Sequence, residues 1–143
     1  MLKGVNPILS PELLYALRSM GHRQELAIVD SNYPCDPDKK VMRLDGVSAT
    51  QVLDAVLSVT PLERDEPESI WRMIVDGQPE KLLPIFTEFQ EIVSKHEDDR
   101  VKIAGLSPEI FKKRASNCVG TVISGERRLY GCILFRKGVI RPD

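Results

Sequence analysis

The residue best suited to exchange protons in this chain is a histidine. The imidazole side chain, with an ordinary pKa of about 6.5, can give and take a proton at neutral pH. Only two histidines occur, His22 and His96. His22 follows Gly21, between an expected helix and an expected strand, where it can be exposed at the rim of a sheet; a surface or capping histidine would occupy the same place. His96 lies in the charged stretch 94–98, and we expect it to be solvated.

An aspartate ends the first expected strand. Asp30 follows the apolar run 25–29, and in α/β folds ligands bind in the crevice beyond the carboxyl ends of the strands. A carboxylate at this position can accept hydrogen bonds from the hydroxyl groups of a substrate. The alternative is an aspartate that only caps a turn or a helix.

Two further segments could contact a ligand. Tyr130, Gly131 and Cys132 lie between a basic turn and the last expected strand. The tyrosine could donate a phenolic hydrogen bond, although packing is the alternative, and the glycine would let a ligand approach the backbone closely. Lys112 belongs to the basic run 112–114, of a kind that usually forms a solvated helix face.

The order of the expected elements predicts the scaffold that must hold these residues. Ser10 and Pro11 suit the start of a helix, and the same pair recurs at 107–108. Apolar periodicity and turn residues predict strands at 25–29, 40–44, 70–75, 101–104, 119–123 and 132–135, helices that begin near 11, 49, 84 and 108, and an exposed charged loop at 62–68. Because strands and helices alternate, we predict a single α/β domain over residues 1–143, a three-layer sandwich with a mainly parallel sheet flanked by helices.

The composition is that of an ordinary soluble globular protein. Of the 143 residues, 42% are hydrophobic and 29% are charged, and the net charge of −1 argues against a protein that coats nucleic acid. The three cysteines form no Cys-x-x-Cys motif and no Cys/His cluster, so we expect free thiols and no structural zinc. We find no signal peptide and no apolar stretch long enough to span a membrane, and we expect a cytoplasmic protein. No phosphate loop, nucleophile elbow or zinc-protease motif occurs, so we expect no cofactor and no metal.

Motifs along nearly the whole chain resemble the fucose mutarotase and ribose pyranase family. The most specific is Gly21-His22 followed by Asp30-x-Asn32-x-Pro34, a spacing far more specific than a lone histidine. The other similar segments are 1–4, 10–17, 45–62, 124–126, 129–131 and 137–139. The N-terminal third resembles the fucose mutarotase branch more closely than the ribose pyranase branch.

This resemblance implies an activity, a site and an assembly. Members of the family interconvert the anomers of free sugars, and ribose pyranases interconvert pyranose and furanose forms. By resemblance, His22 would be the acid/base residue, and Asp30 and the stretch 130–132 would contact the monosaccharide; we add Lys112 as a further contact. The resemblance also implies a homo-oligomeric ring, often a decamer, in which a neighbouring subunit completes each site.

The sequence departs from the family pattern at two positions. The sugar-binding arginine of fucose-type members falls at Pro108, a histidine of ribose pyranases falls near that point, and this sequence has neither. Cys132 stands where both branches commonly have asparagine. Residues 109–112 match the ribose branch. We therefore predict a mutarotase of the L-fucose type and keep three alternatives: a ribose pyranase, a non-catalytic sugar-binding protein linked to transport, and a structural ring protein whose site has decayed.

Overall fold

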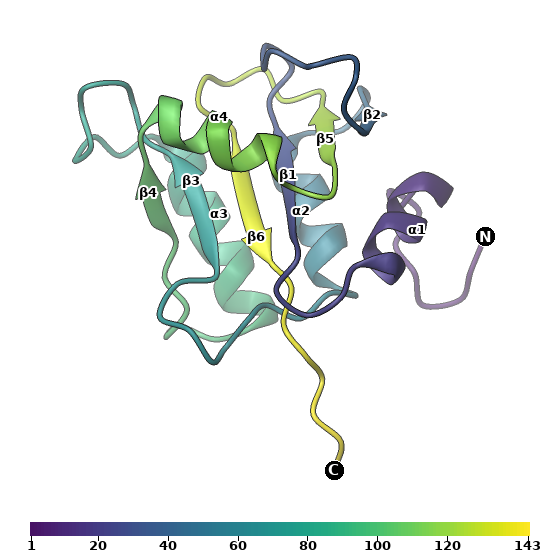
Figure 1. Cartoon of the computed structure of the whole chain (residues 1–143). Coiled ribbons are helices and arrows are strands. Elements are labelled where there is room, and N and C mark those ends of the chain that lie inside the picture. Colours follow the sequence, from purple (N-terminus) through teal and green to yellow (C-terminus); the bar gives the residue numbers. More distant parts are fainter.

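Six strands and four helices make up the structure, a computed structural model that describes residues 1–143 (Figure 1). The strands are β1 (Glu25–Val29), β2 (Val41–Leu44), β3 (Ile70–Met73), β4 (Ala104–Leu106), β5 (Thr121–Ser124) and β6 (Ile133–Arg136), and the helices are α1 (Pro11–Ser19), α2 (Ala49–Leu57), α3 (Pro84–His96) and α4 (Pro108–Ser116). The elements follow one another in the order that the sequence predicts. None of the helices combines the length and the apolar character needed to pass through a lipid bilayer.

The six strands form one sheet in the order β2-β5-β1-β6-β3-β4. The pairs β2–β5, β5–β1 and β3–β4 are parallel, whereas β6 is antiparallel to both of its neighbours, β1 and β3. All strands except β6 therefore run in the same direction, which confirms the predicted mainly parallel sheet. Because β6 begins beside the end of β1, residues that follow β1 lie next to residues that precede β6.

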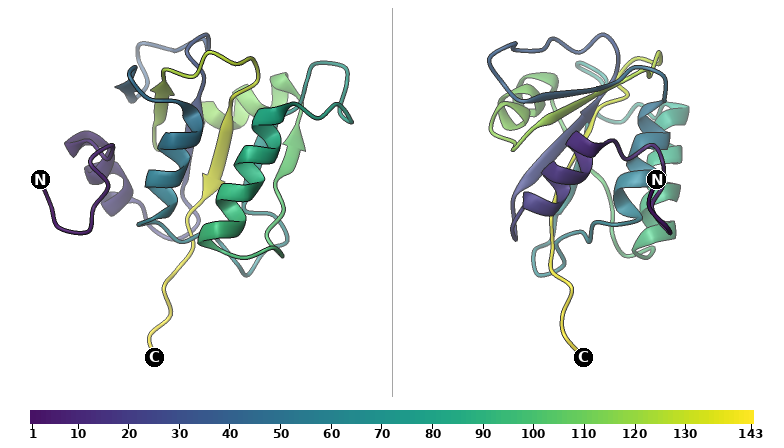
Figure 2. Two further views of the ribbon diagram at one scale, coloured as in Figure 1. Left: turned by 180° about the vertical axis from the view of Figure 1, so that it is seen from behind. Right: turned by 90° about the vertical axis from the view of Figure 1, so that its right-hand side faces the viewer.

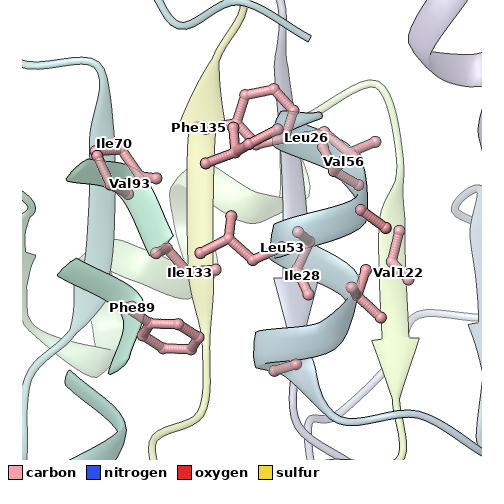
Figure 3. Packing of buried hydrophobic residues seen from close by; sticks show 14 of the residues in the cluster. Leu26, Ile28, Leu53, Val56, Ile70, Phe89, Val93, Val122, Ile133 and Phe135 are labelled. Carbon is pink, nitrogen blue, oxygen red and sulfur yellow. The ribbon is translucent and has the colours of Figure 1, made fainter. Parts of the chain in front are cut away.

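Helices cover both faces of the sheet and make the predicted three-layer sandwich (Figure 2). Helices α2 and α3 pack side by side on one face, and α4 covers the other. Because alternate residues of a strand point to opposite faces, Leu26 and Ile28 of β1 join the α2–α3 core while Ala27 and Val29 join the α4 core. In Figure 3, side chains of α2 and α3 meet those of β1 and β6 in the larger of the two cores.

Local sequence signals set the starts of the helices. The Ser10 hydroxyl accepts a hydrogen bond from the Leu13 N–H at 3.3 Å, and the Ser107 hydroxyl accepts one from the Ile110 N–H at 3.3 Å. A proline follows each of these serines at the first helical position, where an N–H would have no helical partner. Ser48 starts α2 with a capping box. These contacts confirm the predicted helix starts.

Strand β4 begins later than the sequence predicts. The strand expected at 101–104 starts at Ala104, because the Gln90 side chain of α3 forms hydrogen bonds with the backbone of the preceding segment. The Gln90 amide donates to the Val101 carbonyl at 2.8 Å, and its Oε1 accepts the Ile103 N–H at 3.1 Å. These backbone groups are thus unavailable to β3 until residue 104.

The stretch 62–68 is not the fully exposed loop that its charge predicts. Leu62 and Glu63 are buried, because the chain that follows β6 runs beside them. The Glu63 N–H donates to the Arg136 carbonyl at 3.0 Å. A Cβ on Gly138 would lie 2.2 Å from the Leu62 carbonyl oxygen, so only glycine allows the two segments to approach this closely.

Candidate active site

Asp30 and Cys132 lie together where β1 ends and β6 begins. The antiparallel pairing sets Ile28 opposite Ile133, so the residue that precedes β6 stands beside the end of β1. The Cys132 thiol donates a hydrogen bond to Asp30 Oδ2 over 3.4 Å, and both residues are buried. The structure thus brings two of the predicted site residues into direct contact.

The Asp30 carboxylate keeps part of its hydrogen-bonding capacity. Its Oδ1 accepts the Asn32 N–H at 3.0 Å and closes a local turn, which agrees with the alternative that this aspartate caps a turn. Its Oδ2 accepts only the Cys132 thiol, a weak donor. Asp30 is therefore a turn residue that can still accept a stronger hydrogen bond at Oδ2.

Cys132 stays a neutral thiol at physiological pH. Burial, reinforced by the negative charge of Asp30, raises the pKa of Cys132 far above its ordinary value. The positive charge of Lys112 weakly opposes this rise in the pKa of Cys132. Lys112 projects from α4 into a cleft that Tyr33 and Pro34, just after β1, also line. A charged amine therefore stands close to the pair formed by Asp30 and Cys132.

Tyr130 and Gly131 form the end of the turn before β6. Tyr130 has a left-handed φ of +60°, and its hydroxyl accepts the Asp76 N–H at 3.2 Å, which leaves the phenolic proton to donate. Tyr130 lines a different cleft from the one that Lys112 lines. A Cβ on Gly131 would lie 2.6 Å from the Glu126 side chain, so packing within the chain already requires glycine here.

His22 lies at the opposite end of β1, in the loop that follows α1. Its Nε2 is hydrogen-bonded to Glu63 Oε2; the His22 side chain is 39% exposed, and that of Glu63 is 1% exposed. Two contacts anchor the loop, because the Arg23 N–H donates to the Lys137 carbonyl at 2.8 Å and Lys137 Nζ donates to the Met20 carbonyl at 2.7 Å. One ring nitrogen of His22 is therefore held, and Nδ1 makes no hydrogen bond within the chain.

Glu63 is a neighbour of His22 that the sequence does not reveal. Its Oε1 accepts the N–H groups of Asp65 at 2.8 Å and Arg64 at 2.9 Å. The Asp65 N–H and the His22 imidazole lower the pKa of Glu63 to about 2, although burial acts in the opposite direction. Glu63 stands in a run of charged residues, and the apolar Leu62 beside it is the only sequence signal that could have indicated its burial.

His22 and Asp30 do not meet within one chain. The loop from α1 enters β1 at one end of the strand, and Asp30 follows β1 at the other end (Figure 1). The five residue steps from Glu25 to Asp30, at about 3.3 Å each, span about 16 Å. One chain therefore carries two separate groups of candidate residues, an imidazole with a buried carboxylate at one end of β1 and Asp30 with Cys132 at the other end.

His96 is not the solvated residue that its charged surroundings predict. Its Nε2 is hydrogen-bonded to Asp54 Oδ1 at 2.6 Å, and its side chain is only 17% exposed. Lys95 Nζ donates to the same oxygen at 2.9 Å. The packing of α2 against α3 brings Asp54 to these residues, so His96 links two helices.

The fold and these two polar groups define a class of protein, an α/β domain with a partly exposed imidazole at one end of a central strand and a strand-end carboxylate at the other. No group of three His, Cys, Asp or Glu side chains is arranged to hold a metal ion. Residues 3–140 match the model of the RbsD / FucU transport protein family. The chain belongs to this family.

Similarity to individual relatives extends over the full length of the chain. Fucose mutarotase of Homo sapiens is 36% identical over 146 residues, which cover 97% of this chain and 94% of that protein. Fucose mutarotase of Bos taurus is 35% identical over 149 residues, which cover 99% and 96%. The crystal structure of the fucose mutarotase in complex with L-fucose from Streptococcus pneumoniae is 33% identical, with a TM-score of 0.89 and coverage of 98% of this chain and 100% of that one.

Proposed function

We propose that this protein is a mutarotase that interconverts the anomers of a free aldose, with L-fucose as the favoured sugar. The observation that carries the proposal is His22, a partly exposed imidazole with one nitrogen held by a buried carboxylate and the other unbonded. Such a group can accept and return a proton at neutral pH. The similarity to human fucose mutarotase and to a fucose mutarotase in complex with L-fucose supports the choice of sugar.

Mutarotation requires two proton transfers and no change of oxidation state. The His22 imidazole takes the proton of the anomeric hydroxyl as the bond between C1 and the ring oxygen breaks, which produces an open-chain aldehyde. The ring oxygen takes that proton from the imidazolium, the aldehyde rotates, and the reverse steps close the ring on the other face. A positioned acid/base group contributes about 10²–10⁴-fold to such a reaction.

The proposed sugar contacts lie around the end of β1. Asp30 Oδ2 would accept a sugar hydroxyl in addition to the thiol of Cys132, or in its place. Tyr130 would donate its phenolic proton, while Gly131 sets the path of the backbone beside it. Lys112 would reach the sugar from α4 and donate to a further hydroxyl.

We propose that the protein assembles as a homo-oligomeric ring, with a decamer as the expected size, in which His22 of one copy meets Asp30 of a neighbour. The separation of about 16 Å along β1 supports this arrangement, because one small sugar cannot touch both residues of a single chain. Exposed apolar side chains such as Met1, Leu2 and Leu129 offer surface for association. We also propose a cytoplasmic location, where the exposed thiol of Cys35 would stay reduced.

Saturation-transfer NMR on L-fucose, D-ribose and D-galactose tests the proposal. We expect the protein to accelerate anomer exchange of L-fucose, and His22→Ala to lose this acceleration with an unchanged circular dichroism spectrum. His96→Ala is the matched control, because this histidine binds Asp54 in the helical layer and should leave exchange intact.

Three other outcomes would contradict the proposal. Unchanged exchange in His22→Ala would remove the assigned acid/base residue. Binding of a sugar without faster exchange would favour a non-catalytic sugar-binding protein. Faster pyranose–furanose exchange of D-ribose alone would favour a ribose pyranase.

A further inference from the structure

Glu63 is a buried carboxylate with partners on both oxygens. Its Oε1 accepts the N–H groups of Arg64 and Asp65 at 2.9 and 2.8 Å. Its Oε2 faces His22 Nε2 and, at 3.4 Å, Arg23 Nε. Because a buried carboxylate is stable only when it is paired and hydrogen-bonded, these partners fix its orientation. The carboxylate therefore presents one oxygen to the imidazole in a defined direction.

A fixed and ionised acceptor decides where the proton of a neutral imidazole resides. The pKa of Glu63 is lowered to about 2, so the carboxylate keeps its charge throughout the range in which histidines titrate. An acceptor opposite Nε2 requires the proton on Nε2 and leaves Nδ1 as the bare nitrogen. The unbonded Nδ1 of the partly exposed His22 is then the only ring atom able to take a proton from a ligand.

We propose that Glu63 is a positioning residue for the acid/base step: it holds the Nε2–H of His22, orients the ring and makes Nδ1 the atom that exchanges the proton. This inference rests on the mutarotase function proposed above. Nδ1 takes the proton of the anomeric hydroxyl as the bond between C1 and the ring oxygen breaks, and returns it to that oxygen, so protons and electrons balance. During the step Glu63 stays ionised and stabilises the transient imidazolium.

A neighbouring carboxylate offers a matched control. Arg23 Nε lies 3.3 Å from Glu66 Oε1, slightly closer than the 3.4 Å that separates it from Glu63 Oε2. Glu66 also pairs with Arg136 but makes no contact with His22. Glu66→Gln therefore also removes a carboxylate that pairs with Arg23 and leaves the imidazole with its partner.

The tautomer of His22 gives a direct test in the unmodified protein. Nitrogen-15 NMR of the neutral imidazole should show the proton on Nε2 in the wild type and in Glu66→Gln. In Glu63→Gln we expect a mixture of the two tautomers, because an amide can donate to the ring as well as accept from it. Predominant protonation of Nδ1 in the wild type would overturn the inference, even if the Glu63→Gln variant does not fold.

Exchange kinetics provide the second test. Glu63→Gln should lower kcat for L-fucose exchange by about 10–100-fold, as removal of an orienting partner of a functional histidine commonly does, with KM close to that of the wild type. Glu66→Gln should change neither.

The outcomes separate this inference from the function on which it rests. If the wild type accelerates exchange and Glu63→Gln keeps its kcat and the wild-type tautomer, the inference fails and the function stands. If the wild type accelerates no exchange for any sugar tested, the proposed function fails, and the role of Glu63 in that step fails with it.

Discussion

The length of β1 makes a quantitative prediction for mixed oligomers of two inactive variants. His22→Ala removes the proposed acid/base group and Asp30→Asn removes the proposed sugar-binding carboxylate, and about 16 Å of strand separates the two positions. If each site takes its histidine from one copy and its aspartate from a neighbour, either variant alone is inactive, because every site lacks one group. A mixed ring, in contrast, contains some sites with both groups.

The recovered fraction follows from the composition of the mixture. In a random equal mixture, each of the two contributing copies is intact at the required position about half of the time, so about one quarter of the sites are complete. A chain that carries both substitutions, mixed equally with the wild type, is the control. Shared sites again give about one quarter of wild-type activity, whereas sites within one chain give about one half.

The assay is saturation-transfer NMR of L-fucose exchange on subunits that have been dissociated and reassembled together, with native mass spectrometry to establish that the copies have mixed. Recovery near one quarter in both mixtures supports a site built from two copies. Mixed oligomers of the two single variants that remain inactive, together with about one half in the control mixture, would refute the reasoning.

Three further predictions concern stability and the cysteines. Gly125→Ala should lower the free energy of unfolding by about 1–3 kcal/mol in denaturant titrations, because its Cβ would lie 2.1 Å from a backbone carbonyl oxygen; Gly46→Ala, with nothing within 4 Å, should change little, and equal effects would contradict the packing. Lowering the pH from 4.5 toward about 2 should destabilise the wild type, because the ionised Glu63 stabilises the fold above that range and this stabilisation is lost when the carboxylate is protonated. The free energy of unfolding of Glu63→Gln should depend less steeply on pH, and an equal dependence in the two proteins would exclude Glu63 as the cause. At mildly alkaline pH a thiol reagent should modify the exposed Cys35 quickly and Cys132 only on unfolding, because burial raises the pKa of Cys132; rapid labelling of both would disagree with the buried thiol.

The order of the elements is predictable from the sequence because its signals are local. A serine followed by proline starts α1 and α4 through contacts within four residues, and these starts are confirmed. The late start of β4 is not predictable in this way, because Gln90 reaches the backbone of a segment more than ten residues away. The burial of Glu63 likewise depends on pairing with the end of β6 and the residues after it, which no pattern in its own charged stretch reveals.

The candidate site shows the same division between local and distant information. The types and spacing of His22 and Asp30 indicate which residues could do chemistry, and because the two residues flank the predicted strand 25–29, the sequence also places them at its opposite ends. The contact of Cys132 with Asp30 depends on β6 being antiparallel to β1. Alternation of helices and strands predicts a mainly parallel sheet and does not indicate which strand is reversed.

Two buried carboxylates of this chain differ in their capacity to bind a ligand because their hydrogen-bond partners differ. Glu63 has both oxygens occupied, by two backbone donors and by His22, and has little capacity left for a ligand. Asp30 has one oxygen closed by a backbone N–H and the other held only by the weak thiol donor of Cys132, so a sugar hydroxyl can form a stronger bond than the one it displaces. An asparagine at position 132 would donate to Asp30 more strongly than the thiol does and would compete with the sugar for that oxygen. Free acceptor capacity, and not burial or charge, therefore distinguishes the carboxylate proposed to bind the sugar from the carboxylate proposed to orient the imidazole.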